Sequence, residues 1–122
     1  NLPACAKKAA AAAWSAVDAP RKGTMLTLFD DLSACLDEVR AAAGNADLIV
    51  GRLERSVRST RDMLPRLSEA GVVDSGALGM FLFFEGFFFA LEGRVERLAV
   101  VNRQGRRFIF PVHGCASLSF TL

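Results

Sequence analysis

Residues that bind metal ions are scarce in this 122-residue sequence. Its one histidine, His113, stands two residues before Cys115. The other cysteines, Cys5 and Cys35, lie far from both in sequence, and no C-x-x-C pair occurs. A zinc site or a disulfide framework is therefore not expected, and a reducing, cytoplasmic location is the simplest setting.

Strong net charge and long hydrophobic runs are also missing. The net charge of +2 is too small to indicate nucleic acid as a partner. Residues 76–91 are the most apolar stretch, but they fall short of the roughly 20 residues of a membrane span and include Glu85. We expect no membrane span. A membrane-associated helix hairpin is the least favoured of the three functions that we consider. The 52% hydrophobic content instead predicts a buried helical core, or surfaces that something else covers.

Two helices are predicted in the first part of the chain. Residues 3–17 begin with proline and are rich in alanine, which favours a helix, and Trp14 would be the main anchor of this segment. Residues 24–44 carry apolar side chains at steps of three and four residues. Thr24 can cap the start of this second helix, and Gly44 ends it.

The acidic residues of the second helix permit two interpretations. Asp30, Asp31, Asp37 and Glu38 fall mostly between its apolar positions. They indicate either a metal site or a solvated helix face. The solvated face is favoured, because the adjacent Asp30 and Asp31 do not face one another on a helix.

A third helix is predicted up to Pro65, which breaks it, with Asp47 as its cap. Four arginines lie along it: Arg52, Arg55, Arg58 and Arg61. They suit phosphate or nucleic acid, but most such runs are solvated, and Glu54 and Asp62 are close enough to pair with some of them. A short helical turn, closed by Gly71, is expected after the proline.

The segment from Gly76 to Glu92 predicts a helix that is apolar on almost every side. Such a helix belongs in the middle of a bundle. Glu85 is the exception, because a buried carboxylate is unfavourable unless a donor reaches it. One of the arginines within residues 52–61 is the obvious candidate partner, and the sequence does not choose among them.

The turn ahead of this helix contains a second polar feature. Asp74 or Ser75 can cap the helix, and Gly76 and Gly79 allow close approach of the backbone. Free N–H groups at a helix start suit an anion or a nucleotide. A simple cap is the commoner explanation of such a turn.

Residues 93–122 differ from the rest of the chain. They are β-prone, and "NRQG" at residues 102–105 is typical of a hairpin turn. Because a two-stranded hairpin is marginal alone, we expect the tail to pack on the helices, to pair with another chain or to begin a following domain.

Two blocks of the sequence resemble one family in the family's own order. "LPRLSEAGVVDSGALGMFLFFEG" is similar to the closing segment of the nucleotide-binding domain of the dihydroxyacetone kinase family, closest to the ATP-binding subunit of bacterial fatty acid kinase. "AAAAAWSAVDAPRKGTMLTLFDDL" resembles the preceding helix, loop and G-T-M-L start. The resemblance covers residues 6–92 and leaves out the tail from Gly93.

The resemblance implies a fold and a binding site. The family's domain is an eight-helix, barrel-like bundle of antiparallel helices that holds ADP or ATP at one end. By resemblance, Thr24 and Met25 would lie beside the nucleotide, with Met25 against the adenine. Asp74 and Gly76 would line the same pocket, and Arg61 would reach a phosphate.

The sequence departs from the family in its catalytic loops. The aspartate-rich D-G-D-T-G-like loop that binds magnesium and the phosphates does not occur, nor does the G-N-S-G loop. "GNAD" at residues 44–47 follows the G-T-M-L helix instead of preceding it. Since phosphoryl transfer needs metal ions and positioned donors, we expect no catalytic or metal-binding residue here. ATP or ADP with Mg²⁺ is expected in the intact parent, with no cofactor tightly bound to this fragment.

We therefore predict an all-α antiparallel helix bundle over residues 1–92, the C-terminal part of such a domain with further residues upstream, and a β-hairpin-like tail over residues 93–122. The parent would be a kinase of dihydroxyacetone-like or fatty-acyl acceptors, the latter implying a lipid-binding acyl-carrier partner protein. Exposed phenylalanines would favour a homo-oligomer or swapped assembly. The alternative is a non-enzymatic helical interaction or oligomerisation domain of the same fold.

Overall fold

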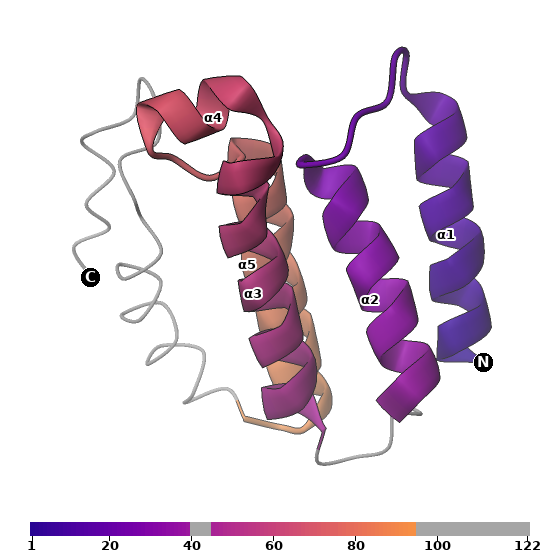
Figure 1. Cartoon of the computed structure of the whole chain (residues 1–122). Coiled ribbons are helices and arrows are strands. Elements are labelled where there is room, and N and C mark those ends of the chain that lie inside the picture. Colours follow the sequence, from indigo (N-terminus) through magenta and orange to yellow (C-terminus); the bar gives the residue numbers. More distant parts are fainter. Residues whose placement is uncertain (40–44, 95–122) are drawn as a thin grey trace.

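The computed structural model describes residues 1–39 and 45–94, and all regular structure in these two ranges is helical (Figure 1). The helices are α1 (Leu2–Ala16), α2 (Met25–Val39), α3 (Ala46–Met63), α4 (Pro65–Ala70) and α5 (Ser75–Leu91). The prediction of an all-α helix bundle is confirmed. The predicted end of the second helix at Gly44 and the predicted strands of the tail lie outside the described residues.

Successive long helices run in opposite directions (Figure 1). α1 lies beside α2, and α2 packs against both α3 and α5, which also pack against each other. The short α4 crosses the end of this group, next to α3. As a result, α2 and α5 both begin at the upper end of the molecule in Figure 1.

The core forms where α5 meets α2 and α3. Ala77 and Phe81 of α5 have no exposed surface, and they belong to one buried cluster with Leu28 of α2 and Leu53 of α3. The expectation that α5 is buried on every side is only partly met, since Phe83 is 60% exposed. Among the described helices, α5 packs most closely against α2 and α3, and Phe87 is also exposed.

Local signals set most of the helix ends as predicted. The Thr24 hydroxyl accepts a hydrogen bond from the Leu26 N–H at 3.3 Å, and so caps α2. The Asp74 carboxylate accepts one from the Ala77 N–H at 2.8 Å, and so caps α5. Gly71 closes α4 with a left-handed φ of 67°, a conformation that favours glycine.

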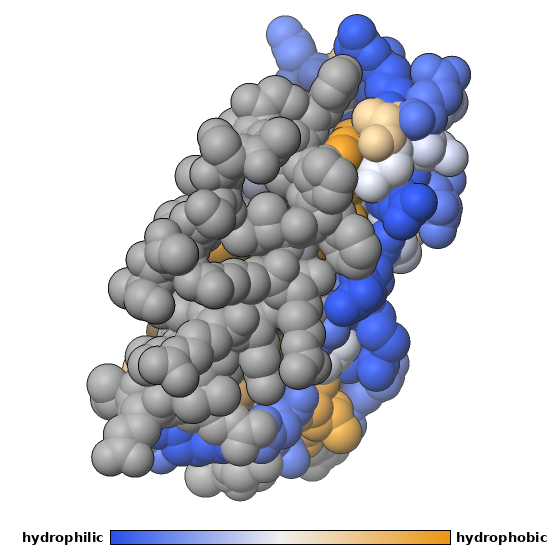
Figure 2. Space-filling view, turned by 90° about the vertical axis from the view of Figure 1, so that its left-hand side faces the viewer, coloured by the Kyte–Doolittle hydropathy of each residue, from blue (hydrophilic) through white to orange (hydrophobic). Residues whose placement is uncertain are grey.

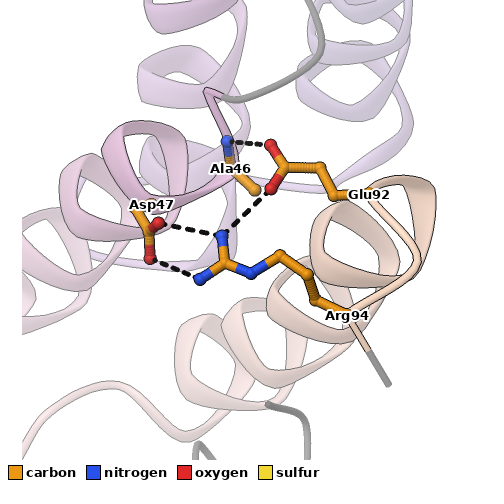
Figure 3. Close-up of polar contacts among 4 residues, drawn as sticks. All are labelled: Ala46, Asp47, Glu92 and Arg94. Atoms are coloured by element: carbon orange, nitrogen blue, oxygen red, sulfur yellow. Dashed lines mark hydrogen bonds and ion pairs between the residues drawn. The ribbon is translucent and has the colours of Figure 1, made fainter. Parts of the chain in front are cut away.

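The start of α3 differs from the prediction, because Asp47 does not cap it. The helix begins at Ala46, and Asn45 at the N-cap position makes no side-chain capping bond. The Ala46 N–H instead donates to Oε1 of Glu92 at 2.8 Å, and the Arg94 guanidinium bridges Glu92 and Asp47 (Figure 3). A residue that follows α5 thus completes the first turn of α3.

The acidic residues of α2 take part in contacts between helices. The Trp14 indole N–H of α1 donates to both carboxylate oxygens of Asp30 at 3.0 Å, in keeping with the predicted anchor role of Trp14. Glu38 forms an ion pair with Arg52 of α3. No group of three or more His, Cys, Asp or Glu side chains in the described ranges is arranged to hold a metal ion.

The outer surface is polar where α3 faces solvent. Arg55, Arg58 and Arg61 are exposed, and Arg58 pairs with Glu54 at 3.3 Å. On the side of the molecule that faces left in Figure 1, the part of the surface that belongs to described residues is largely hydrophilic, with smaller hydrophobic areas (Figure 2). Within residues 1–39 and 45–94, no helix has both the length and the hydropathy needed to cross a membrane.

Glu85 lies on the buried side of α5, with only 3% of its surface exposed. The expected ion pair with an arginine of α3 does not form: Arg52 and Arg58 pair with other acids, and no hydrogen bond or ion pair of Glu85 occurs among the described residues. Burial, and to a lesser extent the negative charge of Glu54, raises the pKa of Glu85 to about 7. The side chain therefore reduces its desolvation penalty by holding a proton near neutral pH.

Glu85→Gln should stabilise the chain at mildly alkaline pH. Because the folded-state pKa of about 7 lies above the ordinary 4.5, wild-type stability is highest below the ordinary value. This stability falls as the pH rises from 4.5 through about 7, and the loss is complete above the folded-state pKa. Glutamine does not ionise, so the free energy of unfolding at alkaline pH should rise by roughly 2 to 3 kcal/mol.

Urea unfolding of both proteins at mildly acidic and mildly alkaline pH measures this difference. Glu69→Gln, at an exposed position of α4, is the matched control and should leave the pH dependence unchanged. Parallel pH profiles for the wild type and the Glu85→Gln variant would show that Glu85 carries no such penalty.

Candidate functional site

A pocket of about 310 Å³ lies at the end of the bundle where α2 and α5 begin. Four of the predicted site residues line it together: Thr24, Met25, Asp74 and Gly76. They come from two segments about fifty positions apart in the chain, the α1–α2 loop with the start of α2, and the turn before α5. The fold therefore brings together residues that were linked only by resemblance.

The α2 side of the pocket is a tightly bonded turn. The Thr24 hydroxyl donates to the Arg21 carbonyl oxygen at 2.9 Å, and the Gly23 N–H donates to the Thr27 hydroxyl at 2.8 Å. Gly23 has a φ of +88°, and a Cβ there would stand 2.8 Å from Cβ of Met63. Only glycine fits without displacement, so the turn is pressed against the end of α3.

The α5 side is anchored on α3. The Asp74 N–H donates to the Thr60 hydroxyl at 3.0 Å, and that fully buried hydroxyl donates in turn to the Val57 carbonyl oxygen. This chain of hydrogen bonds fixes Asp74 as the N-cap of α5, with one carboxylate oxygen used by the cap. The other carboxylate oxygen is left on a residue that lines the pocket.

Met25 and Gly76 lie against each other where the two sides meet. A Cβ on Gly76 would stand 3.9 Å from both Cβ and Sδ of Met25, and 3.2 Å from Oδ2 of Asp74. Met25 is 37% exposed, which is high for a methionine beside a core. Because Gly76 has no side chain, nothing from this position covers the thioether of Met25.

Arg61 does not line this pocket with the other predicted site residues. It is exposed at the end of α3, where its Nη2 atom lies 3.7 Å from the position that a Cβ on Gly71 would take. The structure adds four lining residues that sequence reasoning missed: Val17, Ala19, Arg21 and Leu26. Ala19 and Arg21 lie between the helices predicted over residues 3–17 and 24–44, and no local pattern there marks which side chains line a pocket.

The pocket combines a mostly apolar lining with a few polar groups. Val17, Ala19, Met25 and Leu26 provide its apolar surface, and Arg21, Thr24 and Asp74 its polar side chains. Its volume of about 310 Å³ is at the lower end of the roughly 300 to 1,000 Å³ that is usual for ligand pockets.

A second cavity of similar volume, about 310 Å³, lies between α1, α2 and α5. Alanines of α1 and phenylalanines of α5 form most of its walls: Ala6, Ala9, Ala10, Ala13, Phe84, Phe87 and Phe88. Phe87 is also 40% exposed and stacks on Phe83, with ring centroids 6.4 Å apart. The exposed rings of Phe83 and Phe87 therefore adjoin this apolar cavity, which we call the α1–α5 groove.

Comparison with known proteins identifies the family. The DAK2 domain matches residues 1–88, and the chain therefore belongs to the DAK2 domain family, the L-type family of dihydroxyacetone kinases. This confirms the family-level resemblance found in the sequence.

Two curated relatives illustrate the match. The uncharacterized protein SERP0792 of Staphylococcus epidermidis is 40% identical over 92 residues, which is 71% of this chain and 17% of that protein. The uncharacterized protein SAR1202 of Staphylococcus aureus is 31% identical over 105 residues, 83% of this chain and 19% of that protein. The chain thus spans less than a fifth of the length of these relatives. No solved structure matches.

Gly23→Ala should destabilise the chain because the turn beside the pocket has no room for a methyl group. The positive φ and the 2.8 Å approach to Met63 predict a loss of roughly 1 to 3 kcal/mol in the free energy of unfolding. Gly51→Ala, inside α3 with no atom within 4 Å of the added Cβ, should instead stabilise by about 0.5 to 1 kcal/mol. Urea unfolding of both variants measures the contrast, and equal effects would contradict it.

Proposed function

We propose that this chain forms the adenine side of an ATP- or ADP-binding pocket in a kinase-family domain. The observation that carries the proposal is the pocket shared by Thr24, Met25, Asp74 and Gly76. Membership of the DAK2 domain family supports it, and by the resemblance found in the sequence these four residues would correspond to the family's nucleotide-binding segments.

The chemistry of the pocket suits a purine base. A polarisable thioether such as that of Met25 packs well against an aromatic ring, and the bare backbone at Gly76 leaves space for one. Asp74 has a carboxylate oxygen that the α5 cap does not use, and it can accept a hydrogen bond from an amine or a hydroxyl group. Adenosine phosphates carry both kinds of donor.

The proposal gives this chain binding and no catalytic step. The described residues offer no group of three or more carboxylates or other ligands for Mg²⁺, and a single carboxylate such as that of Asp74 does not make the metal site that phosphoryl transfer requires. In the parent protein, the acceptor would be dihydroxyacetone-like or a fatty-acyl group. A fatty-acyl acceptor would be presented by a lipid-binding acyl-carrier partner protein.

Titration of the full 122-residue chain with ADP tests the proposal. Binding should be weak, in the millimolar range, since only one side of a nucleotide pocket is present. We expect changes in the amide chemical shifts of Thr24, Met25 and Gly76 when ADP is added. These changes should be absent when inorganic phosphate alone is added. Shifts confined to other residues, or none, would contradict the assignment of the pocket.

Gly76→Leu should abolish these shifts, because the new side chain would occupy the space beside Met25. Gly79→Leu is the matched control: it lies one turn further along α5, outside the pocket lining, with no atom within 4 Å of an added Cβ. It should bind ADP as the wild type does. Equal ADP binding by the two variants would place the nucleotide elsewhere.

A second candidate function is a helical interaction domain, favoured by the α1–α5 groove and the exposed phenylalanines beside it. Exposed apolar patches commonly mark protein interfaces. A second copy of the chain, docked or swapped, would cover this side of α5 and rebuild a closed bundle. This function is compatible with nucleotide binding, because the groove and the pocket use different residues.

Replacing Phe83 and Phe87 together by serine should weaken self-association. These exposed rings stack on each other at the edge of the groove, and their removal takes away apolar surface without emptying the core. Analytical ultracentrifugation should show an oligomer for the wild type and a monomer for the variant. Leu48→Ser, 52% exposed on α3, is the control and should leave the oligomer intact. A monomeric wild type would rule out this interaction.

A further inference from the structure

Arg21 is the one cation among the described residues that line the pocket. It lies in the segment between α1 and α2 and was not among the site residues predicted from the sequence. The structure places it beside Thr24, Met25 and Asp74. No ion pair among the described residues includes Arg21, so its positive charge is not neutralised within this part of the chain.

The backbone of Arg21 is held in place by the turn that forms the α2 side of the pocket. Its carbonyl oxygen accepts the 2.9 Å hydrogen bond from Thr24, and Gly23 fits against Met63 with no space for a side chain. Ala19, two residues earlier, adopts a φ of +51°, which is uncommon for a residue other than glycine. The Arg21 side chain thus extends from a constrained loop, while remaining exposed itself.

The two charged residues of the pocket come from different loops and do not pair with each other. Asp74 is fixed at the start of α5, and Arg21 is five residues from the end of α1. The lining between them is largely apolar. A ligand that satisfies both would present a hydrogen-bond donor to Asp74 and an anionic group to Arg21, with a hydrophobic body between.

We propose that Arg21 binds a phosphate group of the nucleotide and gives this pocket its preference for nucleoside phosphates over nucleosides. The inference rests on the proposed nucleotide pocket and adds the residue that selects the charged ligand. A guanidinium suits this task, because it is planar, always charged and able to donate two parallel hydrogen bonds to a phosphate. Such a contact does not require a carboxylate-bound metal ion at the phosphate.

Paired titrations of the full chain with ADP and with adenosine, followed by amide NMR shifts, test the inference. The wild type should bind ADP about tenfold more tightly than adenosine, the ratio expected from one charge-assisted contact. Arg21→Gln should lower the ADP affinity to that of adenosine and leave the adenosine affinity unchanged. Arg21→Lys should restore part of the preference, because it returns the charge without the planar donors.

Lys22→Gln is the matched control for charge. It removes the same unit of charge from the next residue of the same exposed loop, and Lys22 does not line the pocket. The preference for ADP should survive this change. If Lys22→Gln and Arg21→Gln reduce ADP binding equally, the effect is one of general charge, and the role of Arg21 is overturned.

The remaining outcomes separate this inference from the proposed function. Normal ADP binding by Arg21→Gln overturns the role of Arg21 and leaves the pocket assignment standing. Equal weakening of ADP and adenosine by Arg21→Gln also overturns it, because the guanidinium would then contact the base. A wild type that binds neither compound contradicts the nucleotide pocket itself, and the inference falls with it.

Discussion

The contact of α5 with α2 and α3 is the interaction on which the rest of the described structure depends. α5 is so apolar that water is a poor environment for any of its sides, and its fully buried residues Ala77 and Phe81 join side chains of both neighbouring helices in one cluster. Burial of this surface is the main favourable term in folding such a small chain. Once α5 is placed, the start of α5 and the start of α2 must lie at the same end of the bundle, and the pocket follows from that geometry.

The pocket is built by loops but positioned by α3. Thr60, with no exposed surface, links α3 to the backbone of Asp74, and Met63 at the end of the same helix meets Gly23 of the α1–α2 loop. Both walls of the pocket are therefore held against the same helix, α3. This arrangement is suited to binding, because the geometry of the lining residues does not depend on either loop alone.

The sequence allowed correct prediction wherever a short-range rule decides the structure. Thr24, Asp74 and Gly71 act at helix ends through bonds to residues two to four positions away. Thr24 and Gly71 were assigned from the local pattern, and Asp74 was one of two candidate caps beside Ser75. The start of α3 was misassigned, because its capping partner is distant in the sequence. The sequence likewise did not predict that Arg52 pairs with Glu38 or that Arg21 lines the pocket, because both depend on which helices become neighbours.

The bond between the Ala46 N–H and Glu92 has a consequence for cooperativity. The residue at the N-cap of α3, Asn45, makes no capping bond of its own, so the first turn of this helix is complete only when the end of α5 is docked. Two segments 46 positions apart are thereby coupled in their local opening: fraying at the end of α5 releases the start of α3. Amide protons at the start of α3 and at the end of α5 should thus exchange at similar rates, because the two ends open together.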